Sequence, residues 1–145
     1  MADQLMLTAR ERLDVLDSTP EALRMEATYA PEGNPPPAHW HPSQDEHFEV
    51  LEGEMRVIVS GDERELRAGD TLHIPRETVH QMWNPSAAPA RVSWEVRSPG
   101  RTEEWFRTLD RLFREGPLDD NGMPPLDKLL EAVNEYNDVF RLGEP

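Results

Sequence analysis

The chain has 145 residues, which is long enough for one domain with a hydrophobic core. Its 15 basic and 29 acidic residues give a formal net charge of −14, which repels phosphate backbones and argues against a nucleic-acid partner. It contains no cysteine, no basic and apolar leader and no apolar run of about 18 residues. These absences argue against thiolate ligands, disulfides, a signal peptide and a membrane span, and we expect a cytoplasmic protein.

The first thirty residues predict a β-hairpin. Residues 5–7 are apolar and are compatible with an edge strand, a dimer contact or a frayed end. A short strand is expected over residues 8–16 and a turn over residues 17–20. A second strand should follow, because apolar residues then alternate with polar ones at Leu23, Met25, Ala27 and Tyr29. The alternative is a helix over residues 5–16, which the helix-forming run Ala-Arg-Glu-Arg would favour.

The next stretch places two histidines on one face of a strand. Pro31, Gly33 and the run Pro35–Pro37 break regular structure and form a stiff extended segment. This proline run predicts a rigid lip beside the strand, and a docking motif for a partner's aromatic groove is the alternative. Successive side chains of a strand point to opposite faces, so His39 and His41 project from the same side.

A carboxylate and a third histidine complete a candidate ligand set. Glu46 begins a period-two row that can oppose the two imidazoles on a neighbouring strand. About thirty residues later, His80 follows a turn that contains a proline and starts another apolar strand. His47 and His73 lie outside this pattern and are expected to be ordinary polar residues. Glu46 could instead point outward, which would leave a three-histidine set.

Three imidazoles and one carboxylate suit a divalent first-row transition metal such as iron, manganese, nickel, copper, cobalt or zinc. Four protein ligands on one side of a six-coordinate ion would leave two positions for water or substrate. This open arrangement is typical of a catalytic metal rather than a closed structural site. The alternative reading is a buried polar cluster, which is costly unless each group is paired.

The same residues carry a resemblance to the cupin superfamily. Its first motif is Gly, five residues, His, one residue, His, three or four residues, Glu, six residues and Gly. This spacing is satisfied here by Gly33, His39, His41, Glu46 and Gly53.

The second cupin motif is also present with one departure. It runs Gly, five residues, Pro, one residue, Gly, two residues, His, three residues and Asn. Gly69, Pro75, His80 and Asn84 fit it, whereas Glu77 stands at the usual second glycine. Glycine would allow a positive φ there and glutamate resists it, so the turn before His80 is in question.

Short strands separated by glycine and proline predict an all-β sandwich or jelly roll, and the resemblance implies the double-stranded β-helix barrel of cupins. Residues 55–59, 71–74, 80–83 and 92–96 are expected to be strands, with a turn at 60–63 and a loop at 85–89. We assign residues 1–100 to the barrel and residues 101–145 to a helical extension of the same domain.

The extension predicts two amphipathic helices. The first has Thr102 as its N-cap and ends at Gly116, and the second ends at Gly143. We expect both helices to pack outside the barrel, although they could close its mouth or bind a second subunit. Their apolar residues recur at helical spacing, as Trp105, Phe106, Leu109, Leu112 and Phe113, and then as Leu126, Leu129, Leu130, Val133, Tyr136 and Phe140.

Side chains in register with the ligands predict a largely apolar pocket wall, made of Phe48, Val50, Met82 and Trp94. The first functional hypothesis is a small metal-dependent enzyme of the dioxygenase kind that acts on an apolar or aromatic molecule. The alternatives are a non-catalytic small-molecule binder or sensor, and a sugar-type isomerase. The isomerase would need a further titratable group facing the cavity, and the sequence identifies none. The resemblance also implies a homodimer.

Overall fold

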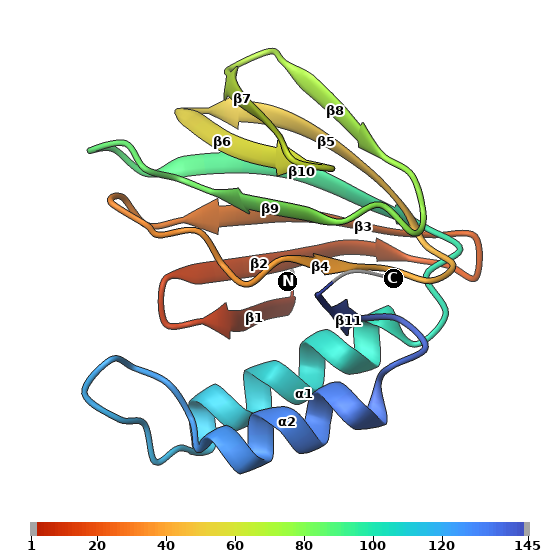
Figure 1. Ribbon diagram of the computed structural model, residues 1–145, viewed down its shortest axis with the longest axis vertical. Helices are drawn as coiled ribbons and strands as arrows, with labels where there is room; N and C mark the ends of the chain where they lie inside the picture. The colour runs from red at the N-terminus through yellow and green to blue at the C-terminus, as the bar shows by residue number, and fades with distance from the viewer. Residues whose placement is uncertain (1–2, 144–145) are drawn as a thin grey trace.

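The computed structural model describes residues 3–143. Within that range eleven strands form two antiparallel sheets that face each other, with two helices beside them (Figure 1). The larger sheet has the order β1-β2-β3-β10-β5-β8, and the smaller sheet has the order β11-β4-β9-β6-β7. The strands are β1 (Asp3–Thr8), β2 (Glu11–Ser18), β3 (Ala22–Tyr29), β4 (His39–Trp40), β5 (Asp45–Glu52), β6 (Glu54–Val59), β7 (Asp62–Arg67), β8 (Thr71–Ile74), β9 (His80–Trp83), β10 (Ala90–Arg97) and β11 (Arg141–Leu142).

The core lies between the sheets and follows the period-two patterns of the sequence. In the larger sheet, alternate residues of β3, β10 and β5 are buried, and they stand opposite one another in rows such as Met25–Trp94–Phe48. Met55 and Val57 of β6 are buried from the smaller sheet. Apolar side chains that face inward from both sheets exclude water, and this burial is the main favourable term for a fold of this kind.

The predicted hairpin is present, but its first strand is displaced. A turn at residues 9–10 separates β1 from β2, so the strand expected over residues 8–16 begins at Glu11 and continues to Ser18. The alternative helix over residues 5–16 is wrong. Leu5, Leu7 and Leu13 are buried by strand alternation, whereas Leu16 is 58% exposed on the other face.

Two motif residues are needed for backbone geometry. Gly53 joins β5 to β6 with φ of +80°, and a Cβ there would lie 2.6 Å from the carbonyl oxygen of Pro89. Glycine is therefore required for both the conformation and the close approach. Glu77 also adopts a positive φ, +65°, and its N–H donates to the carbonyl of His41 at 2.8 Å. The turn before His80 thus keeps the left-handed conformation although its residue is not glycine.

Helices α1 (Thr102–Glu115) and α2 (Leu126–Glu135) lie outside the two sheets, side by side along β1 and β11 (Figure 1). Thr102 is the first residue of α1 and not its N-cap, and its hydroxyl donates to the carbonyl of Pro99. The second helix is shorter than expected, because Tyr136 ends it and the chain then turns into β11. In the described part of the chain, neither helix is long and apolar enough to cross a membrane.

The free edge of β1 is covered by α1. The N–H of Met6 donates to the carboxylate of Asp110, and Arg114 donates to the carbonyl of Gln4. These bonds use backbone groups that an edge strand would otherwise offer to another chain.

Candidate metal centre

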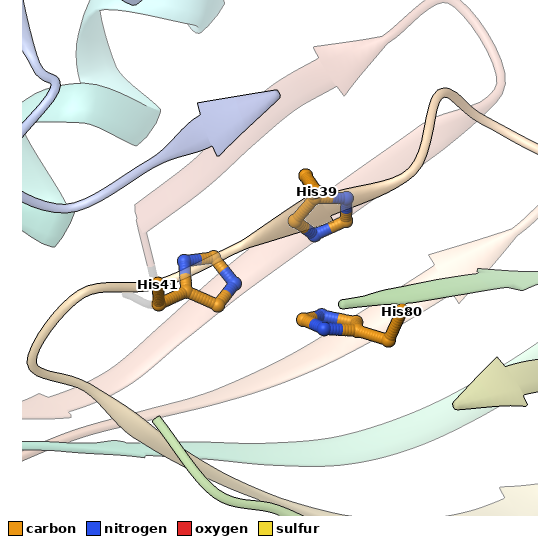
Figure 2. A group of neighbouring side chains, drawn as sticks. All are labelled: His39, His41 and His80. Carbon is orange, nitrogen blue, oxygen red and sulfur yellow. The ribbon is translucent and has the colours of Figure 1, made fainter. Parts of the chain in front are cut away.

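Three histidines converge between the sheets. His39 begins β4, His41 follows the same strand, and His80 begins β9. Their candidate ligand atoms all lie within 4.8 Å of one another. Figure 2 shows the three rings pointing toward a common point, His39 and His41 from one segment and His80 from the neighbouring strand. β4 and β9 pair with His39 directly opposite His80, which explains the approach of the two rings.

Each ring is anchored through Nδ1 to a backbone carbonyl. His41 Nδ1 lies 2.7 Å from the carbonyl oxygen of Val139, and His80 Nδ1 lies 2.9 Å from that of Thr78. His39 Nδ1 lies 3.3 Å from the carbonyl oxygen of Pro37. A carbonyl only accepts, so these contacts place a proton on Nδ1 and leave the Nε2 lone pair to face the site. Metal-binding histidines are oriented in this way.

The larger sheet contributes Glu46 from β5, with only 1% of its surface exposed. Its Oε1 lies 3.1 Å from Nε2 of His41 and 3.0 Å from Nε2 of His80. Its Oε2 accepts a hydrogen bond from Trp94 Nε1 at 2.8 Å. Glu46 therefore points into the site and not toward solvent, and the four predicted ligands lie together.

The donor atoms fit a cation. Neither His41 Nε2 nor Glu46 Oε1 has a well-directed hydrogen bond among the described residues, although both are buried and close. With the Nδ1 protons fixed, the imidazole lone pairs face a carboxylate oxygen, and either a proton on Nε2 or a metal cation must lie between them. Two ligands about 2.1 Å from a metal and at right angles are about 3.0 Å apart, close to the spacing seen. A divalent metal held by the histidines and Glu46 would supply this charge.

The electrostatics agree with this arrangement. Burial, together with the neighbouring His80 and His41, lowers the pKa of His39 to about 3, so its imidazole is neutral at physiological pH. Burial would raise the pKa of Glu46, but attraction to His41 and His80 outweighs it and holds the pKa well below its usual range. Burial would lower the pKa of His41, and the Glu46 carboxylate raises it instead. The site thus offers an ionised carboxylate and at least one neutral imidazole.

The segment after α2 also contributes to the site. Phe140 stacks on His39, with ring centroids 4.9 Å apart and an interplanar angle of 25°. The preceding Val139 provides the carbonyl that anchors His41, and β11 pairs with β4. The sequence does not predict this role, because Phe140 fits the helical spacing of α2 and a backbone carbonyl leaves no sequence signal.

The ligands lie in a cavity of about 380 Å³ that is mostly apolar. Phe48, Met82 and Trp94 are among its lining residues, whereas Val50 is buried in the core and is not. His47 and His73 stack on each other, centroids 4.4 Å apart, and are not among the lining residues. No described arginine or lysine lines the cavity. The helices and the last segment close its open side with Thr102, Trp105, Phe106, Leu109, Phe113, Met123, Leu126, Leu129, Leu130, Val133, Phe140 and Leu142.

A second polar pair lines the same cavity and was missed in the sequence. Glu11 of β2 stands directly opposite Tyr29 of β3 in the strand register, and both side chains face the cavity. The signal was available: Glu11 shares strand parity with the buried Leu13, and Tyr29 shares it with Ala27. An acidic residue on the inner face of a strand is unusual enough to single out.

Comparison with known families gives the class of the domain. Residues 25–96, which include all four candidate ligands, match the cupin domain. The chain belongs to the cupin superfamily. The match covers β3 to β10 and leaves Glu11, the two helices and β11 outside it. The two-sheet fold with C-terminal helices agrees with the predicted double-stranded β-helix.

This cupin is similar to three characterised proteins over part of its length. It is 39% identical over 79 residues to quercetin 2,3-dioxygenase of Bacillus subtilis, 54% of this chain and 23% of that protein. It is 43% identical over 79 residues to the oxidoreductase iacF of Pestalotiopsis fici, 53% of this chain and 39% of that protein. The third is the tetracenomycin polyketide synthase protein TcmJ of Streptomyces glaucescens, 33% identical over 58 residues, 40% of this chain and 39% of that protein. In each case the similarity spans less than half of the relative.

Solved structures show the same fold at low identity. An RmlC-like cupin from Shewanella frigidimarina superposes with a TM-score of 0.61 at 15% identity, covering 70% of this chain and 88% of that one. KdgF from a Halomonas species gives a TM-score of 0.58 at 19% identity, covering 66% of this chain and 86% of that one. At such identities the likeness extends to the fold alone.

Proposed function

We propose that this cupin is a metal-dependent oxidoreductase of the dioxygenase type that acts on a small, largely apolar aromatic molecule. The observation that carries the proposal is a cluster of three Nε2 lone pairs and one buried carboxylate at the wall of an apolar cavity of about 380 Å³. Similarity to a quercetin dioxygenase and to a second oxidoreductase supports the reaction class.

The metal would be held by His39, His41, His80 and Glu46, and when bound it would supply Lewis acidity and, if redox-active, access to dioxygen chemistry. The protein's own residues orient the candidate ligands and shield the site from water. Trp94 fixes the free oxygen of Glu46, and the backbone carbonyls fix the histidine tautomers. The aromatic side chains that line the cavity exclude water and offer flat apolar surfaces to an aromatic substrate.

One alternative fits the cavity less well, and the other differs from the proposal only in turnover. A sugar-type substrate needs several hydrogen-bonding groups around it, whereas most of the lining is apolar. A non-catalytic binder or sensor would hold the same apolar molecules without turnover. Turnover therefore separates it from the enzyme that we propose.

The test combines metal content with oxygen consumption. Protein purified without a polyhistidine tag is analysed by mass spectrometry for iron, manganese, nickel, copper, cobalt and zinc, alongside the His41→Ala and His80→Ala variants. His73→Ala serves as the control, because its ring lies outside the cavity lining. We expect stoichiometric metal in the wild type and control, loss in both site variants, and metal-dependent oxygen uptake with quercetin.

Two results would count against the proposal. Equal metal content in all four proteins would mean that the histidine cluster does not bind the ion. Stoichiometric redox-active metal without oxygen uptake on quercetin or simpler phenols would favour the binding or sensing alternative.

A further inference from the structure

The cavity holds a second ionisable pair, separate from the metal ligands. Glu11 is the first residue of β2 and Tyr29 is the last residue of β3, and the strand register places them directly opposite each other. The Tyr29 hydroxyl lies near enough to the Glu11 carboxylate to act as a hydrogen-bond donor that lowers its pKa. Among the described lining residues, the ionisable ones are this pair, Glu46 and the three histidines, so no lining arginine or lysine pairs with Glu11.

Glu11 lies in the cavity lining, apart from the ligand cluster, and its proton affinity is unusual for a carboxyl group. Burial raises the pKa of Glu11 to about 7, the hydrogen bond from Tyr29 lowers it, and the negative charge of Glu46 raises it further. A general base works best when its pKa lies near the working pH. Glu11 is therefore suited to exchange a proton with a molecule bound in the cavity.

We propose that Glu11 is the general base of this pocket, that it takes the hydroxyl proton of a phenol or enol bound at the metal centre, and that Tyr29 is its positioning residue. The O–H bond of the substrate breaks, its electron pair stays on the substrate oxygen, and the proton forms a new O–H bond on Glu11. The step needs no oxidant. This inference rests on the proposed function, since it assumes that the metal centre binds a hydroxylated molecule.

The experiment uses quercetin as the probe and zinc as the metal, because zinc has no redox chemistry and the bound molecule is not consumed. Quercetin is titrated into zinc-loaded wild type, Glu11→Gln and Tyr29→Phe at neutral pH. The absorption spectrum reports whether the bound molecule is neutral or ionised. Glu49→Gln is the matched control, because Glu49 is exposed on the outer face of β5. Zinc content is measured in each protein.

We expect the wild type and the Glu49→Gln control to bind quercetin as its anion. Glu11→Gln should keep its zinc and show the spectrum of neutral quercetin. It should also bind quercetin more weakly by on the order of tenfold, since a difference of one pKa unit corresponds to a factor of ten in an equilibrium constant. A second readout needs no substrate. In zinc-loaded protein with ¹³C-labelled glutamate carboxyls, one carboxyl should titrate near neutral pH and be absent from Glu11→Gln. Its midpoint should rise in Tyr29→Phe, where the hydrogen bond that lowers it is lost.

The outcomes separate the two proposals. If Glu11→Gln binds ionised quercetin as well as the wild type does, or if Glu11 titrates in the ordinary range of a glutamate, the base assignment is overturned while the proposed function stands. If the zinc-loaded wild type binds no quercetin, both are overturned. A midpoint that does not move in Tyr29→Phe overturns the positioning role of Tyr29.

Discussion

At the scale of single residues, Glu77 holds a strained backbone conformation in the turn before His80. Its positive φ allows the N–H to bond the carbonyl of His41, one of the candidate ligands, so the turn links the two motifs. A side chain with a Cβ is strained in this region of φ, and the surrounding structure must hold it there.

Replacing Glu77 by glycine should therefore stabilise the protein. We expect Glu77→Gly to raise the free energy of unfolding by on the order of 1 kcal/mol, reduced by the greater chain entropy of glycine in the unfolded state. Urea denaturation measures the change. Glu49→Gly is the control and should destabilise, because Glu49 lies within strand β5. A destabilising Glu77→Gly would mean that the glutamate side chain makes a favourable contact that outweighs the strain.

Glu11 should make the stability of the protein depend on pH. Its pKa of about 7 in the folded state exceeds the value of 4.5 for an unperturbed glutamate, so the folded state binds more protons between these values. Stability must then fall as pH rises through this window. We expect the advantage of Glu11→Gln over the wild type in free energy of unfolding to grow from pH 4.5 to about 7 and then level off. It should reach on the order of 1 kcal/mol, because Glu11 is only half-buried and solvent screens its charge. Denaturation at several pH values measures it, and a constant difference would contradict the raised pKa.

The candidate ligands could be predicted because strand parity and motif spacing are local properties. His39 and His41 share a face wherever the strand lies, and the motif supplies the partners. Glu11 could be flagged by the same parity, but its position in the cavity depends on how β2 lies beside β3 in the folded sheet. Val50 points to the same side of β5 as Glu46 and Phe48, yet it is absent from the cavity lining. Strand alternation therefore predicts which residues face inward but not which of them reach the cavity.

At the scale of elements, the segment after α2 is fixed from outside by Arg101. This arginine lies immediately before α1, and its Nη2 donates to Asp138 and to the carbonyl of Glu135, both at 2.7 Å. Its guanidinium also lies 4.6 Å from the centroid of the Tyr136 ring. Asp138 adjoins Val139, whose carbonyl anchors His41. Arg101 therefore connects the helices to the orientation of a metal ligand.

Loss of Arg101 should weaken metal binding although it is not a ligand. Residues that support a ligand typically change metal affinity by about 10 to 100-fold when they are replaced. We expect Arg101→Gln to fall at the lower end of that range, measured by competition for zinc with a chromophoric chelator. Arg24→Gln is the control, because it breaks only an exposed ion pair with Glu95. Unchanged zinc affinity in Arg101→Gln would show that the ring of His41 is held without this segment.

The elements of the barrel were more predictable than those of the extension. Glycines, prolines and alternating apolar residues mark the strands directly. The end of α2 was misjudged because Tyr136 and Phe140 continue its apolar spacing, while tertiary contacts with Arg101 and His39 turn the chain instead. Such contacts join residues far apart in sequence, and no local pattern records them.

At the scale of the whole molecule, the net charge of −14 acts on every ligand that approaches. It attracts metal cations and repels anions, and no described arginine or lysine in the cavity lining offsets the repulsion. A phenol or enol should therefore enter more readily in its neutral form. In the mechanism that we propose, Glu11 would then remove the proton after binding.

The net charge of −14 predicts that salt changes the rate at which a charged ligand associates. Between about 0.01 M and about 0.1 M salt the screening length falls from about 30 Å to about 10 Å, so repulsion at a distance weakens. In stopped-flow mixing with zinc-loaded protein, association of ionised quercetin at high pH should accelerate as salt is added. Association of the neutral molecule at low pH should change little. If ionised quercetin instead associates more slowly as salt is added, a local positive region must attract it. The protein could then capture the anion directly, and no base inside the cavity would be needed.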